Sequence, residues 1–113
     1  MKRMNPEFKD KLLIALRSGD YRQTRSQLKN TDGCYCVMGV GCQLSGLGDW
    51  VDDGDDGYMC YVLKDGVGYW SGAPQPVLDQ MGIDSETENW LGYMNDEQKK
   101  TFVEIAAFIE ENL

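Results

Sequence analysis

Apolar residues near the start of the chain recur at three- and four-residue spacing, which is the period of an amphipathic helix. The face built by this spacing consists of Phe8, Leu12, Leu13, Ile14, Ala15 and Leu16. Asn5 is a good N-cap, Pro6 fits the first helical position, and Gly19 is typical of a helix end. The pattern therefore predicts a helix that begins at Pro6 and ends before Gly19.

Short strand-like runs around turn residues predict two β-hairpins. The first covers residues 27–36 with Asp32-Gly33 in its turn, and the second covers residues 58–70 with Asp65-Gly66 in its turn. Residues 37–44 between them are apolar on nearly every side, which predicts a buried helix. Two glycines in this helix would let another backbone approach closely.

The last third of the chain has the pattern of short helices. Residues 76–81 form one, Ser85 with Glu88 predicts a capping box that opens the next, and Thr101 with Glu104 predicts another. The apolar stripes of the last two helices consist of Trp90, Leu91, Met94, Phe102, Ile105, Ala106 and Ile109. We therefore expect an α+β fold in which four or five helices pack with a small antiparallel sheet of two hairpins.

Length and composition agree with one globular domain over residues 1–113. A chain of 113 residues with 42% hydrophobic and 11% aromatic residues is large enough to build a core and too short for two domains. No segment approaches a signal peptide or a membrane span, so we expect a cytoplasmic protein with reduced cysteines.

The net charge of the chain indicates which classes of partner it can bind. Acidic residues outnumber basic ones by 19 to 11, giving a net charge of -8 without histidine. Most basic residues lie between Lys2 and Lys29, and the rest of the chain is strongly acidic. A net-acidic surface repels phosphate backbones, so direct binding to nucleic acid is not expected.

Several segments together resemble a family of small uncharacterised proteins of bacteriophages and prophages. The segments are Asn5 to Tyr21, Asp32 to Leu44, Trp50, and Leu91 to Leu113. Members of that family have a DGxxCCLGVLCDLA-like segment and an LNDxGxSFxEIADxIExNL-like tail. The resemblance implies a phage origin, hence the cytoplasm of a host cell. By analogy with other accessory phage proteins, it also implies a protein that binds and disables a host factor.

The four cysteines are candidates for either core packing or chemistry. Cys34, Cys36, Cys42 and Cys60 could offer four thiolates to zinc, but the usual C-x2-C spacing is absent and apolar residues surround them. A reduced cysteine usually packs as a small hydrophobic side chain. We therefore expect core packing, no metal and no cofactor.

An acidic segment between Gly48 and Gly57 is expected to be a solvated loop. It does not have the ligand spacing of a calcium-binding EF-hand loop, since Lys64 falls where the twelfth-position glutamate would be. Its acidic side chains could dock on a basic partner, with the tryptophan as an anchor. The predicted partner-binding residues are Asp49, Trp50, Asp52, Asp53, Asp55 and Asp56.

Catalysis has little support in the sequence. Without histidine, Ser-His and Cys-His pairs are excluded, and no glycine motif for phosphate is present, so we do not expect an enzyme. An alternative to protein binding is a small-molecule binder that sequesters a cyclic nucleotide signal, with guanidinium groups on its phosphates. The residues predicted for that ligand are Arg22, Arg25, Tyr61, Tyr69 and Trp70.

The function that we predict is the binding and inhibition of a host protein through the acidic surface. The predicted target is a component of antiviral defence, such as a nucleic-acid-binding immune effector. We do not expect the protein to bind membranes. The sequence leaves open whether it forms a homo-oligomer. A structural piece of the virion has no sequence feature for or against it.

Overall fold

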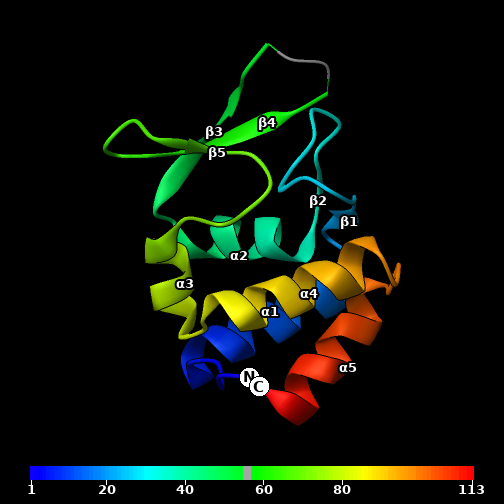
Figure 1. The fold of residues 1–113 in the computed structure, drawn as a ribbon. Coiled ribbons are helices and arrows are strands. Elements are labelled where there is room, and N and C mark those ends of the chain that lie inside the picture. Colours follow the sequence, from blue (N-terminus) through cyan, green and yellow to red (C-terminus); the bar gives the residue numbers. More distant parts are fainter. Residues whose placement is uncertain (55–56) are drawn as a thin grey trace.

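The helices gather at one end of the molecule and the three-stranded sheet lies at the other (Figure 1). The computed structural model describes residues 1–54 and 57–113. In chain order the elements are α1 (Pro6–Ser18), β1 (Arg22–Gln23), β2 (Cys34–Tyr35), α2 (Val37–Ser45), β3 (Gly48–Asp52), β4 (Met59–Leu63), β5 (Gly68–Tyr69), α3 (Gln75–Met81), α4 (Ser85–Asp96) and α5 (Phe102–Asn112). This arrangement confirms the predicted α+β class.

The second predicted hairpin is confirmed, and the sheet gains a strand where a loop was predicted. β4 pairs antiparallel with β5, and on its other side antiparallel with β3, which occupies the first part of the acidic segment. Aspartate is unfavourable in strands. Pairing overrides this preference because β3 places Trp50 opposite Tyr61, whose rings lie 4.8 Å apart.

The first predicted hairpin is confirmed in part, and its second arm gains a parallel partner that was not predicted. The two arms meet in an antiparallel bridge between Lys29 and Tyr35. Two hydrogen bonds flank this bridge, from the Asn30 N–H to the Cys34 carbonyl and from the Cys36 N–H to the Leu28 carbonyl, each at 3.0 Å. On its other side, β2 pairs in parallel with β1.

Leu28 connects this first hairpin to the end of the second one. Its N–H donates to the Trp70 carbonyl at 2.7 Å, and its carbonyl accepts from the Cys36 N–H at 3.0 Å, so Leu28 joins the two halves of the fold.

α2 lies at the centre and contacts α1, α3, α4, β2 and β3. As predicted, it is buried, and one of its glycines permits a close approach. A Cβ atom on Gly39 would lie 1.8 Å from the Leu28 carbonyl oxygen, whereas one on Gly41 would meet only the flexible end of Met81, at 3.1 Å. The Gly39 position therefore sets how closely α2 lies against the preceding loop.

Helix α1 begins and ends as predicted, but one residue of its stripe faces solvent. Asn5 caps the helix through its side chain and Gly19 ends it with φ of 81°. Ile14, which we placed on the apolar face, is 71% exposed. On a helical wheel Ile14 lies beyond the face that packs on α5, so the core covers a narrower stripe than the run of apolar residues suggested.

The capping box at Thr101 and Glu104 is confirmed, and the one at Ser85 is wrong. Asp84 caps α4 instead and accepts the Thr87 N–H at 2.9 Å. Glu88 is occupied elsewhere, because its carboxylate accepts the Ala73 N–H at 2.8 Å. Leu91 and Met94 are buried as expected, but Trp90 is 39% exposed.

A fully buried asparagine joins α4 to the start of α2 and to β1. The Asn95 Oδ1 atom accepts from Gln23 Nε2 at 2.9 Å and from the Val37 N–H at 3.2 Å. Its Nδ2 atom donates to the Thr24 carbonyl at 2.9 Å and to Asp96 Oδ1 at 2.8 Å. One carboxamide thus holds three segments that are far apart in the chain.

The glycines of α2 provide the first test of this packing. We expect Gly39→Ala to lower the free energy of unfolding by about 3 kcal/mol or more, since the new methyl group overlaps a backbone carbonyl. Gly41→Ala is the matched control in the same helix, with an expected change within about 1 kcal/mol because helix propensity offsets a small shift of Met81. Urea denaturation followed by circular dichroism measures both. Equal effects would contradict the close approach at Gly39.

Removal of the Asn95 carboxamide is the second test. Asn95→Ala leaves the buried Val37 N–H without its acceptor, and we expect a loss of about 3 kcal/mol in the free energy of unfolding. Asn89→Ala, at an exposed position of the same helix, should change it by less than about 0.5 kcal/mol. Thermal and urea denaturation of the two variants give the comparison. A loss below about 1 kcal/mol in the free energy of unfolding for Asn95→Ala would show that the Asn95 hydrogen bonds contribute little to stability.

Candidate functional site

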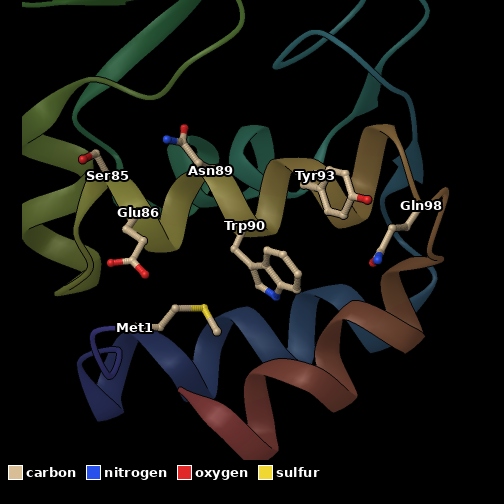
Figure 2. A pocket seen from close by; sticks show the side chains of 7 residues that line it. All are labelled: Met1, Ser85, Glu86, Asn89, Trp90, Tyr93 and Gln98. Atoms are coloured by element: carbon tan, nitrogen blue, oxygen red, sulfur yellow. The ribbon is translucent and has the colours of Figure 1, made fainter.

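An open aromatic hollow lies along the exposed side of α4 (Figure 2). Its volume is about 800 Å³, and its lining consists of Met1, Ser85, Glu86, Asn89, Trp90, Tyr93 and Gln98. The rings of Trp90 and Tyr93 stack with centroids 5.5 Å apart, and Phe108 of α5 lies 6.5 Å from Trp90. Helical spacing of three residues brings the two exposed rings together. We call this surface the aromatic hollow.

A second depression, of about 410 Å³, shares Asn89 and Tyr93 with the aromatic hollow. Helix α4 forms one wall, and the beginning of α2 and the segments around Gln27 and Gly72 form the others. The residues from α4 are Glu88, Asn89, Gly92, Tyr93, Asp96 and, just after the helix, Glu97. We call this depression the acidic cavity.

The acidic cavity offers hydrogen-bond acceptors and no positive charge. Glu88, Asp96 and Glu97 line it, and none of the described residues in its lining is a lysine or arginine. Loss of water around Glu88 raises the pKa of its carboxyl above the ordinary value, against the opposing effect of the Ala73 N–H. A positive group beside Glu88 would favour the ionised form again.

Two further features of the acidic cavity have no structural explanation in the packing. The Oε1 atom of Gln27 is buried and has no hydrogen-bond partner among the described residues. Gly92 lies inside α4, where glycine costs about 0.5–1 kcal/mol relative to alanine. A Cβ atom there would meet nothing within 4 Å, so no neighbouring group requires a glycine.

The residues predicted to bind a partner lie on β3 and just after it. Asp49, Asp52 and Asp53 are exposed, as a docking surface requires. Trp50 differs from the expected anchor because its ring is half-buried next to Tyr61, and its Nε1 atom donates to Gln43 at 2.9 Å. Asp55 and Asp56 lie outside the described residues. The acidic side chains, rather than the tryptophan, are therefore the accessible part of this surface.

The residues predicted for a nucleotide do not form the expected stacking surface. Tyr61 is 1% exposed, and its hydroxyl accepts the Gly48 N–H at 2.7 Å and donates to the Cys42 carbonyl at 2.9 Å. Strand alternation turns it toward Trp50 and the core, so it cannot stack on a base.

The other members of that set have separate contacts. Arg22 donates to the Asp32 carbonyl, and the exposed Trp70 donates from Nε1 to Asp53. Arg25 is exposed and Tyr69 is half-buried. A carboxylate next to Trp70 disfavours a phosphate group at that ring.

Three of the four cysteines are buried, as core packing predicts. Cys36, Cys42 and Cys60 are 6%, 0% and 5% exposed, while Cys34 is half-buried. Burial raises the pKa of Cys36 to about 12 and also raises the pKa of Cys42, so these thiols stay protonated at neutral pH. Among residues 1–54 and 57–113, no three Cys, Asp or Glu side chains gather in a way that could hold a metal ion.

Sequence reasoning missed both depressions on α4. Exposed aromatic residues three positions apart, and a glycine inside an amphipathic helix, were the available signals. The apolar character of Trp90 led instead to its placement in the core.

No helix in the described part of the chain has the length and apolarity needed to cross a membrane. No curated protein and no solved structure matches this chain. Residues 4–113 match the family model described as a domain of unknown function (DUF8296), and the chain therefore belongs to that family.

Proposed function

We propose that this protein is a phage-encoded inhibitor that acts by covering a surface of a host protein in the cytoplasm of the host cell. The observation that carries the proposal is β3, a five-residue strand at the edge of the sheet with exposed aspartates on it. A component of antiviral defence, such as a nucleic-acid-binding immune effector, is the proposed target because such proteins have basic surfaces that complement this charge.

The edge of β3 supports binding by strand addition. Its only strand partner among the described residues is β4, because β5 and the Asn30 bridge both lie on the other side of β4. An extended segment of a partner can pair with such an edge through its main chain, while alternate side chains provide specificity. Asp49 lies on the face opposite Trp50, and Asp52 is the last residue of the strand.

The packing beneath β3 supports a rigid binding surface. Trp50 lies between Tyr35 and Tyr61, at centroid distances of 5.9 and 4.8 Å, and Lys29 lies 5.4 Å above its ring. A preorganised strand loses less conformational freedom on binding than a loop would. The strand that replaces the predicted loop thus favours recognition of a partner.

Binding rather than turnover is the proposed activity. The chain has no histidine, and the buried thiols of Cys36 and Cys42 stay protonated at neutral pH because burial raises the pKa of each. Sequestration of a cyclic nucleotide is the less favoured alternative, since Tyr61 is unavailable for stacking.

Charge removal on β3 tests the proposal. We expect the double variant Asp49→Asn with Asp52→Asn to lose at least about tenfold in affinity for the captured host protein, because two complementary charges disappear from the contact. The measurement is a pull-down from host lysate, identification of the captured protein by mass spectrometry, and titration of that purified protein. Asp10→Asn with Glu111→Gln is the control, since it removes the same net charge from α1 and α5.

Three results would contradict the proposal that the β3 aspartates bind the host protein. The affinity could stay unchanged, or the control could lose as much as the β3 variant, which would reduce the effect to net charge. Alternatively, the β3 variant could self-associate yet still capture the target, which would assign the aspartates to protection of an edge strand. A rise in melting temperature with cyclic dinucleotides would favour the alternative function.

A further inference from the structure

The contacts of β4 show which of its main-chain groups are used in pairing with β3. The Leu63 N–H donates to the Val67 carbonyl at 3.0 Å, on the β5 side of β4 and therefore away from β3. Main-chain groups alternate in direction along a strand, so Val62 and Cys60 direct theirs toward β3. The ladder between β3 and β4 is thus built on these two residues.

The register transfers this alternation to β3. Asp49 and Val51 lie opposite these two residues, so their main-chain groups belong to the ladder. The alternate residues Gly48, Trp50 and Asp52 turn theirs toward the open edge. The Gly48 N–H is satisfied by a tyrosine hydroxyl at 2.7 Å. In residues 1–54 and 57–113, no hydrogen bond from outside the sheet reaches the main chain of Trp50. Donors and acceptors at this spacing are what an extended chain pairs with.

The side chains beside this edge define the composition of such a chain. Asp49 is exposed, Val51 is 47% exposed, and alternation puts both on the face opposite Trp50. Relative to an added strand they stand at non-hydrogen-bonded positions, where opposite side chains come closest. A hollow of about 480 Å³ next to them gives these side chains room. Lys64 also lines the hollow, but it lies beyond the first residue of β3, so negative charge prevails along the rest of the strand.

We propose that β3 binds an extended basic segment of the host protein as an additional antiparallel strand. From its N-terminus the segment has a basic residue opposite Asp52, a β-branched residue opposite Val51, any residue opposite Trp50 and a basic residue opposite Asp49. The third residue exchanges both main-chain hydrogen bonds with Trp50. Antiparallel addition continues the order of the sheet, and complementary charge selects the basic residues. This inference rests on the function proposed for β3 and names the element of the partner that the strand takes.

Methylation of the peptide main chain separates strand pairing from a contact between charges alone. The probe is the blocked pentapeptide acetyl-Lys-Val-Thr-Lys-Thr-amide, titrated into the full chain and followed in ¹H–¹⁵N spectra. A methyl group on the central Thr nitrogen removes the N–H that donates to the Trp50 carbonyl. The matched control has the methyl group on the second Lys nitrogen, whose N–H points away from β3. We expect the first peptide to bind at least about fivefold more weakly than the second.

Hydrogen exchange locates the peptide on the strand. The amide protons of Trp50 and Asp52 gain acceptors on binding, so we expect them to exchange at least about fivefold more slowly at saturation. The amide protons of Asp49 and Val51 already lie in the ladder with β4. They are the internal control and should change less.

Charge reversal at Asp49 tests the side-chain pattern. The unchanged chain should bind the probe at least about fivefold more tightly than the same peptide with Glu as its fourth residue. Asp49→Lys should invert this preference. Glu111→Lys makes the same charge change at an exposed position of α5 and should leave the preference as it is. If Asp49→Lys does not fold, the two methylated peptides decide with the unchanged chain.

Strand addition is overturned if the two methylated peptides bind equally, or if the probe does not bind at all, which would assign the aspartates to protection of the edge. Tighter binding of the reversed sequence Thr-Lys-Thr-Val-Lys overturns the antiparallel direction, and a preference for Glu overturns the basic pattern.

Failure of this inference can be told apart from failure of the proposed function. Capture of a host protein that depends on Asp49 and Asp52, together with equal binding of the methylated peptides, leaves the proposed function standing and overturns strand addition. Pairing of the probe with β3 without capture of any host protein supports strand addition and counts against the proposed function.

Discussion

The Asn95 carboxamide is the interaction on which the arrangement of the molecule depends. It is fully buried, and its hydrogen bonds reach Gln23, Thr24, Val37 and Asp96. A buried amide has to satisfy its donors and acceptor in one geometry, so it specifies orientation more strongly than apolar contacts do. It fixes α4 against α2 and the β1 segment. As a result the acidic cavity lies between α4 and the loop that holds Gln27.

A second constraint on the fold is the close approach of the α2 backbone to the loop that contains Leu28. Gly39 lets α2 lie against the carbonyl of Leu28, and Leu28 in turn bonds to Trp70 after the last strand. The helical end and the sheet end are therefore linked through one buried loop residue. With the framework held in this way, β3 and the exposed side of α4 are left as separate accessible surfaces, one acidic and rigid, the other hollowed and partly aromatic.

Four basic residues of the N-terminal segment have local partners. Arg17 forms an ion pair with Glu110 at 3.2 Å, Lys9 donates to the Glu110 carbonyl, and Arg22 donates to the Asp32 carbonyl. Lys29 lies over the rings of Tyr35 and Trp50. These contacts leave exposed carboxylates on β3, in keeping with the net charge of -8.

The sequence by itself determined the α+β class, the helices α1, α2, α3 and α5 with most of their ends, the β4–β5 hairpin and the burial of three cysteines. These features follow from local periodicity, capping residues and turn residues, which act over a few positions. Tertiary structure alone decided the parallel pairing of β2, the strand at Gly48–Asp52, the cap at Asp84 and the exposure of Trp90. Each depends on a contact distant in sequence, such as Leu28 with Trp70 or Trp50 with Tyr61. The acidic cavity belongs to the same group, because its walls meet only when the chain has folded.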